Sequence, residues 1–121
     1  MSIRLFHMDQ MSGYLAAKFI VSGVAEDVSG EFESIAEHCK RTKNHKLLID
    51  TTGFDLKIST LDRYLVGERV QMFARYGINV AFVCTPDQLD PQRFGELVAR
   101  NRGVNLRGFT DVQAAEEWLL T

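Results

Sequence analysis

Carboxylate and hydroxyl side chains follow two apolar segments of the sequence that we expect to be strands. They are Asp50 and Thr52 after the first segment, and Thr85 and Asp87 after the second. In open α/β sheets, ligands bind beyond the carboxyl ends of the strands, so these side chains could orient a small polar ligand or Mg²⁺. The same residues could equally cap and turn the chain where each strand ends, and we favour that interpretation.

Hydroxyl groups also stand directly before an expected helix, at Ser59 and Thr60. A phosphate on either hydroxyl would be stabilised by the unpaired N–H groups and the partial positive charge of a helix N-terminus. The sequence Ser59-Thr60-Leu61-Asp62 is also a capping box, in which the serine hydroxyl accepts a backbone hydrogen bond. We favour the cap, because it needs only the serine, and keep Ser59 and Thr60 as possible phosphoacceptors.

The stretch 93–107 is basic, with Glu96 as its single acidic residue. Its arginines are Arg93, Arg100, Arg102 and Arg107. Such a patch could bind an acidic partner or an anionic ligand. A solvated helix face is the more common explanation, and we favour it here.

Other signs of enzyme chemistry are weak. The three histidines, His7, His38 and His45, do not form the i, i+4 pair of a helical metal site. Cys39 and Cys84 have neither metal-ligand nor disulfide-framework spacing. The sequence has no glycine-rich phosphate loop and no serine nucleophile elbow. We therefore expect no metal, no cofactor and no catalytic activity.

The composition is that of one globular domain spanning residues 1–121, with 45% hydrophobic and 25% charged residues. The formal net charge of −2 argues against a nucleic-acid binder, because such domains usually carry a basic excess. No apolar run approaches the roughly 18 residues of a membrane span. Because two cysteines make no disulfide framework, we expect a cytoplasmic protein.

Hydrophobic periodicity predicts the element order β-β-α-β-α-β-α-β-α. The expected elements are a hairpin of strands 3–8 and 14–21, helix 25–42, strand 46–50, helix 61–76, strand 78–84, a helix capped by Asp90, strand 104–109, and a terminal helix capped by Thr110. After the hairpin, strict alternation predicts an α/β fold with a mostly parallel sheet and about four helices. Six apolar residues are expected in its core: Ile49, Leu65, Phe73, Phe82, Leu97 and Trp118.

The helix expected over residues 61–76 is apolar on more than a single stripe. Such a helix is buried on more than one side, either within its own domain or at a subunit interface. Core packing is our first expectation and a homodimer the second, and an apolar pocket beneath this helix is a third possibility.

The element order resembles the STAS family, the small domains of bacterial anti-sigma factor antagonists and of anion transporters. It looks most like their uncharacterised STAS-like bacterial relatives, whose last helix carries an Ala-x-x-Trp-Leu type signature. Here that signature is matched by Ala115, Trp118 and Leu119, and the apolar strand by Leu48-Ile49-Asp50. The resemblance covers nearly the whole chain.

In the antagonists of this family, the loop after that strand carries Asp-Ser-Ser-Gly, and a partner kinase phosphorylates a serine there. The matching stretch in this chain is Lys57-Ile58-Ser59-Thr60-Leu61. Ser59 and Thr60 keep the two hydroxyl groups, whereas Ile58 and Leu61 replace the aspartate and the glycine. The resemblance therefore implies a degenerate phospho-switch motif.

These observations lead us to expect a non-catalytic STAS-like module that regulates or binds a protein partner. The alternative is a protein that binds a small ligand, either a lipid or an anionic metabolite, or an unrecognised enzyme. Either would use the loops after Asp50 and Cys84. STAS-like domains share a general layout with lipid carriers of the CRAL-TRIO type, although no residue here specifies a lipid.

Overall fold

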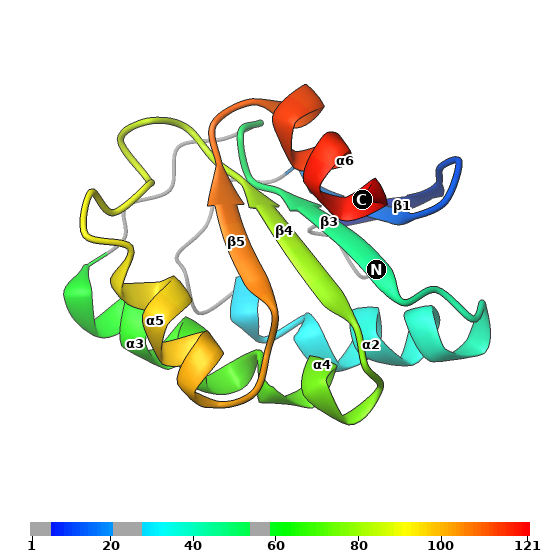
Figure 1. Ribbon diagram of the computed structural model, residues 1–121, viewed down its shortest axis with the longest axis horizontal. Helices are drawn as coiled ribbons and strands as arrows, with labels where there is room; N and C mark the ends of the chain where they lie inside the picture. The colour runs from blue at the N-terminus through cyan, green and yellow to red at the C-terminus, as the bar shows by residue number, and fades with distance from the viewer. Residues whose placement is uncertain (1–5, 21–27, 54–58) are drawn as a thin grey trace, which may run out of the picture.

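The computed structural model describes residues 6–20, 28–53 and 59–121 (Figure 1). Its strands are β1 (Phe6–Gln10), β2 (Leu15–Phe19), β3 (Lys46–Asp50), β4 (Asn79–Val83) and β5 (Leu106–Phe109). Its helices are α2 (Phe32–Arg41), α3 (Thr60–Arg69), α4 (Gln71–Arg75), α5 (Phe94–Asn101) and α6 (Val112–Leu120). The outer ends of the expected hairpin, the start of the helix expected from residue 25, and the motif residues Lys57 and Ile58 lie outside the described residues.

The five strands form one sheet in the order β1-β2-β3-β4-β5. Strands β1 and β2 are an antiparallel hairpin in which Phe6 pairs with Phe19. The other neighbours are parallel, and Leu47 pairs with Val80, which in turn pairs with Leu106. The expected α/β fold, with a mostly parallel sheet and an N-terminal hairpin, is confirmed.

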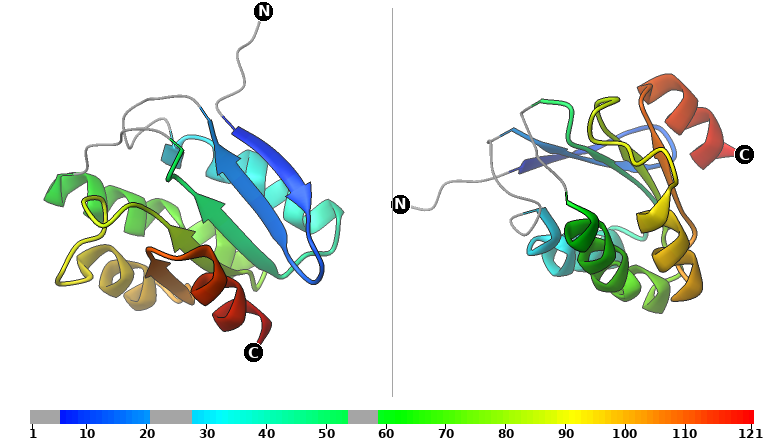
Figure 2. Two further views of the ribbon diagram at one scale, coloured as in Figure 1. Left: turned by 90° about the horizontal axis from the view of Figure 1, so that it is seen from above. Right: turned by 90° about the vertical axis from the view of Figure 1, so that its left-hand side faces the viewer.

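Helices cover the two faces of this sheet unequally (Figure 2). Helices α2, α3, α4 and α5 lie on one face, and α6 lies on the other. Because side chains alternate along a strand, Leu47 and Ile49 face the larger group of helices while Leu48 faces α6. Each face therefore has its own apolar cluster.

The helix expected over residues 61–76 is interrupted at Val70, which ends α3 and precedes α4. Ile49 and Phe73 are fully buried, but Leu65 and Leu97 are 37% and 52% exposed, so those two core predictions were wrong. Phe82 and Trp118 are only half-buried.

The exposure of Leu65 follows from the way α3 packs on α5. A Cβ atom on Gly67 would lie 2.7 Å from Val98, so this side of α3 is pressed against α5. Leu65 is two residues away and therefore points to roughly the opposite side of its helix. Leu97 precedes Val98 by one residue, about 100° around α5, and also points away from the contact.

Two of the three predicted helix caps, Asp90 and Thr110, were placed at the wrong residue. Helix α5 begins after Arg93, whose φ of 55° is left-handed, rather than directly after Asp90. The Asp90 carboxylate still accepts a hydrogen bond from the N–H of Phe94, at 2.9 Å. The N-cap of α6 is Asp111 and not Thr110, because the aspartate carboxylate reaches two N–H groups of the first turn.

Candidate functional site

The polar residues expected at the strand ends turn the chain. Asp50 Oδ1 accepts hydrogen bonds from the backbone N–H and the hydroxyl of Thr52, at 2.8 and 2.6 Å. The N–H of Thr85 donates to the side-chain oxygen of Gln88 at 3.1 Å, and Asp87 is exposed. The arrangement is that of a local turn at each of the two strand ends.

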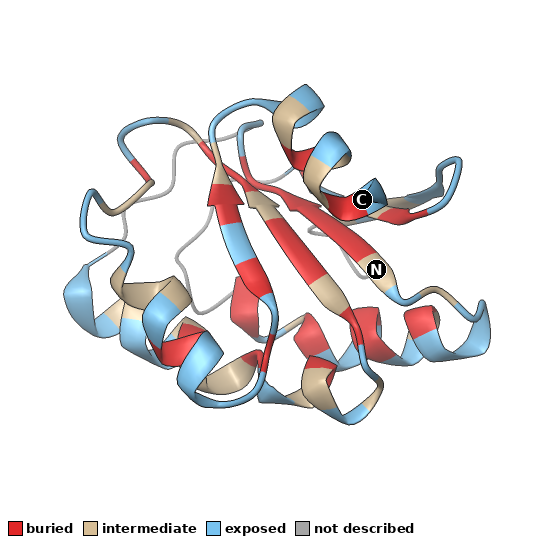
Figure 3. Ribbon diagram, in the orientation of Figure 1, coloured by how far each residue is buried: buried red, intermediate tan, exposed pale blue. Residues whose placement is uncertain are grey.

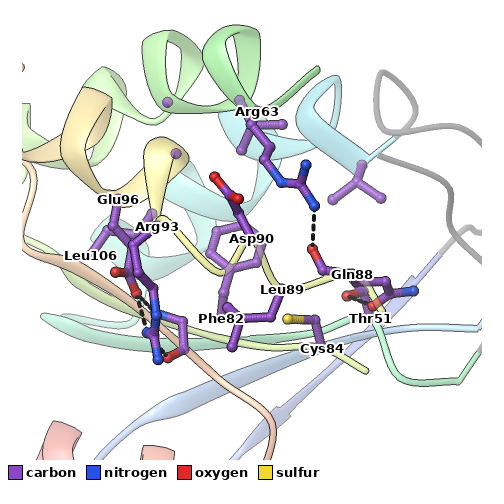
Figure 4. A pocket seen from close by; sticks show the side chains of 15 residues that line it. Thr51, Arg63, Phe82, Cys84, Gln88, Leu89, Asp90, Arg93, Glu96 and Leu106 are labelled. Carbon is purple, nitrogen blue, oxygen red and sulfur yellow. Dashed lines mark hydrogen bonds and ion pairs between the residues drawn. The ribbon is translucent and has the colours of Figure 1, made fainter. Parts of the chain in front are cut away.

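A partly enclosed pocket of about 110 Å³ lies near these turns, between α3, α5 and the sheet (Figure 4). Its apolar lining is formed by Val28, Val66, Phe82, Leu89 and Leu106, together with the thiol of Cys84. The pocket is thus beneath the helix that follows Ser59, at the carboxyl ends of the parallel strands. This is the edge where α/β sheets usually bind ligands.

The four residues predicted at the strand ends are not among those that line this pocket. Their neighbours Thr51, Cys84 and Gln88 line it instead. Asp50 is on the α6 side of β3, because it follows Ile49, which faces the other helices.

Sequence reasoning also missed Gly67, Gly95 and Gly108, which line the pocket with backbone. A glycine inside a helix or strand signals a close backbone approach, and this signal was available in the sequence. A Cβ on Gly108 would lie 2.8 Å from the Leu89 side chain, so the strand has no room for one here.

Gln88 and Thr51 are buried polar residues of the pocket, 5% and 2% exposed. The side-chain oxygen of Gln88 accepts hydrogen bonds from the Thr51 hydroxyl and the Thr85 N–H, both at 3.1 Å. The Gln88 backbone carbonyl accepts from the Arg63 guanidinium at 3.2 Å. Gln88 therefore ties α3 and the ends of β3 and β4 together.

Arg93 and Glu96 close the outer edge of the sheet at β5. Glu96 Oε1 accepts a hydrogen bond from the Gly108 N–H, and Arg93 Nη1 donates to the Gly108 carbonyl at 2.8 Å. The two side chains also pair with one another at 2.9 Å. Together they satisfy backbone groups that an edge strand otherwise leaves unpaired.

The other arginines of the expected basic patch lie apart from Arg93. Arg102 pairs with Glu68 of α3, and this contact holds the pKa of the Glu68 carboxyl below its usual range. Arg107 lies 5.6 Å from the ring of Phe109, on the face of β5 opposite Gly108. Arg100 is exposed on α5. The four arginines are thus spread over both faces of the sheet.

Ser59 is exposed and caps α3 through a complete capping box. The Asp62 N–H donates to Ser59 Oγ at 3.1 Å, and the Ser59 N–H donates to Asp62 Oδ2 at 2.9 Å. Thr60 is the exposed first residue of the helix. Both hydroxyl groups are thus at the positive end of the α3 dipole.

The Cys84 thiol lines the pocket and is a candidate nucleophile. Burial raises the pKa of its thiol to about 11, despite the opposing charges of Arg93 and Arg63. The group is therefore a protonated thiol near neutral pH, which reacts slowly because little thiolate is present. Within residues 6–20, 28–53 and 59–121, no three His, Cys, Asp or Glu side chains are grouped to hold a metal ion. In those same ranges, no helix has the length and apolar character needed to cross a membrane.

No protein-family model and no curated protein matches this sequence. A solved structure is similar in fold: an uncharacterised protein from the DUF3478 family with a SpoIIAA-like fold, from Shewanella loihica PV-4. The two chains are 21% identical, the match covers 98% of each, and the TM-score is 0.52. The chain therefore has a SpoIIAA-like, STAS-like fold, which confirms at the level of fold the resemblance seen in the sequence.

Proposed function

We propose that this chain is a non-catalytic regulatory module that binds a protein partner through the outer surface of α3. One observation carries the proposal: Leu61, Tyr64 and Leu65 are 65%, 40% and 37% exposed. Their i, i+3, i+4 spacing places them on one side of the helix, as an apolar stripe. Exposed apolar surface of this kind marks interaction sites on soluble domains.

The candidate reactive groups at the strand ends support a binding role without chemistry. The Asp50 carboxylate is held in its own turn by Thr52, and the Cys84 thiol is protonated. Ser59 serves in this proposal as the cap of α3, which keeps the stripe on a well-formed helix. Cys39 and Cys84 are free thiols, which fits the cytoplasmic location that we propose.

Charge substitutions on the stripe test this function. The full chain serves as bait in native cell extract, as wild type and as Leu61→Glu. The matched control is Val112→Glu, since Val112 is 45% exposed on α6, on the other side of the sheet. Thermal unfolding checks that both variants remain folded.

We expect a partner that the wild type and Val112→Glu retain and Leu61→Glu loses. Size-exclusion chromatography of the same proteins shows whether the partner is a second copy, since a dimer would then be broken by Leu61→Glu alone. A partner lost equally in both variants, or retained by both, contradicts the assignment to α3.

A further inference from the structure

The pocket between α3, α5 and the sheet has a different character from the stripe on α3 (Figure 4). It lies on the side of α3 that carries Val66 and Gly67, away from the exposed stripe. Its apolar lining includes the side chains of Phe82, Leu89 and Leu106. A ligand here would therefore meet carbon atoms over most of its surface.

The charged side chains around the pocket already have partners. Arg93 and Glu96 bind each other and Gly108. The Asp90 carboxylate accepts from the N–H groups of Phe94 and Gln92, at 2.9 and 3.2 Å. Arg63 donates to the Gln88 carbonyl.

The formal charges of the pocket also cancel. Arg63 and Arg93 are balanced by Asp90 and Glu96, all four of which line it. Hydrogen bonds to backbone N–H groups lower the pKa of the Asp90 carboxyl, so this residue stays ionised near neutral pH. An anionic ligand would gain no net attraction from such a balanced set, and it would lose its hydration on entering.

The size of the pocket limits the ligand further. An apolar cavity of about 150 Å³ stays dry and takes up benzene, because water needs two to four polar partners. The pocket here, at about 110 Å³, is of the same order. The backbones of Gly67, Gly95 and Gly108 form its walls, and the Cβ positions of Gly67 and Gly108 are blocked by packed neighbours.

From this combination we infer that the pocket binds an uncharged, mainly apolar molecule about the size of a single ring. The inference goes beyond the protein-binding role proposed above and does not depend on it. It also departs from the anionic metabolite expected as one alternative from the sequence.

Toluene and benzoate are matched probes, because they share the ring and differ in the carboxylate. Each is titrated into the ¹⁵N-labelled full chain, with the backbone amides of Gly67, Gly95 and Gly108 as reporters. The amides of Gly13 and Gly77, which do not line the pocket, are internal controls.

Alkylation by iodoacetamide gives a second readout, because the chain contains two buried cysteines and only Cys84 lines the pocket. We expect toluene at three times its dissociation constant to slow modification of Cys84 by about fourfold, as simple competition requires. Modification of Cys39, which is in the main core, should not change.

A variant whose pocket is filled by a larger side chain tests the same site. Val66→Phe places a ring in the pocket, and Leu97→Phe places the same ring on the exposed side of α5, outside the pocket. Toluene should bind the Leu97→Phe protein as it binds the wild type, and should not bind Val66→Phe. If Val66→Phe does not fold, the comparison of toluene with benzoate on the wild type still decides the question.

Selective shifts of the pocket glycines by toluene, with protection of Cys84 alone, would establish the site. Absence of both effects, equal protection of the two cysteines, or toluene binding retained by folded Val66→Phe would overturn it. Benzoate binding as tightly as toluene would overturn the uncharged class of ligand.

Discussion

The two faces of the sheet differ in how they are covered and in what they carry. One face is packed against α2, α3, α4 and α5 and holds the larger apolar cluster, which includes Phe19, Phe32 and Phe73. The other face is packed against α6 and holds a smaller cluster that includes Tyr14 and Leu119. Figure 3 shows the buried residues concentrated on the strands and on the inner sides of the helices.

Both proposed sites are on the face of the sheet that is covered by α2, α3, α4 and α5, which we call the crowded face. There, α3 and α5 must pack on one another as well as on the sheet, and Gly67 lies against Val98 with no room for a Cβ atom. This double requirement leaves the pocket below α3 and exposes the apolar stripe above it. On the other face, α6 packs on β4, and the apolar cluster between them combines the fully buried Ala81 and Ala115 with larger side chains such as Leu119.

The largest predicted loss of stability is on the crowded face. Phe73 is fully buried, and its ring centroid lies 5.4 Å from that of Phe32. Phe73→Ala should lower the free energy of unfolding by about 3–5 kcal/mol, because it removes a large side chain and leaves a cavity. Chemical denaturation measures the change, and a loss below about 1 kcal/mol would show that this face does not hold the main core.

Trp118→Ala should have a smaller effect, because among the described helices α6 is the only one on its face of the sheet. Trp118 is half-buried, with its ring centroid 5.8 Å from that of Phe109. We expect a loss of about 2 kcal/mol, below the 3–5 kcal/mol range typical of an enclosed tryptophan. The same denaturation experiment, run beside Phe73→Ala, makes the comparison. A loss equal to that of Phe73→Ala would mean that the two faces contribute alike.

The order of elements could be predicted from sequence because each strand is a short apolar run and each helix has its own periodicity. The exposure of Leu65 and Leu97 to water could not be predicted from the sequence. Their exposure depends on the contact between Gly67 and Val98, which are far apart in sequence. The cap of α5 was misplaced because Arg93 takes a left-handed conformation that its residue type does not favour.

For the candidate site, the sequence predicted the location in the fold but not the side chains that line it. The rule that ligands bind at the carboxyl ends of parallel strands indicates the correct edge of the sheet. The lining side chains depend on the alternation of β3 and on how α3 and α5 cross the sheet, so Thr51 and Gln88 replace Asp50 and Asp87. The pairing of Glu96 with the Gly108 backbone is likewise a tertiary contact that no local pattern predicts.

A pH experiment sharpens the description of the α6 face. The Tyr14 hydroxyl donates to Glu116 Oε2 at 2.8 Å, and burial together with this carboxylate raises the pKa of Tyr14 from 10.0 to about 12. Tyr14→Phe should lower the free energy of unfolding by about 1.5 kcal/mol at neutral pH, because it removes a charge-assisted hydrogen bond.

The contribution of Tyr14 should then depend on pH in a defined direction. The folded protein holds the phenolic proton more tightly than the unfolded chain, so the stabilisation is complete below pH 10 and is lost towards pH 12. Denaturation of wild type and Tyr14→Phe across this range should show their difference shrinking as pH rises. A difference that stays constant would mean that Tyr14 ionises alike in both states.

The smallest effect is expected at Ser59, the N-cap of α3. Ser59→Ala should cost about 1 kcal/mol, because the Asp62 N–H loses its acceptor, whereas Ser59→Asp should be nearly neutral, since aspartate caps about as well as serine. The proposed role of Ser59 as a cap further predicts that partner binding is the same for wild type and Ser59→Asp. Thermal unfolding and the capture experiment with the α3 variants measure the two effects. Phosphate on Ser59 of protein from native cells, together with a partner that releases Ser59→Asp, would instead restore the phospho-switch that the degenerate motif argues against.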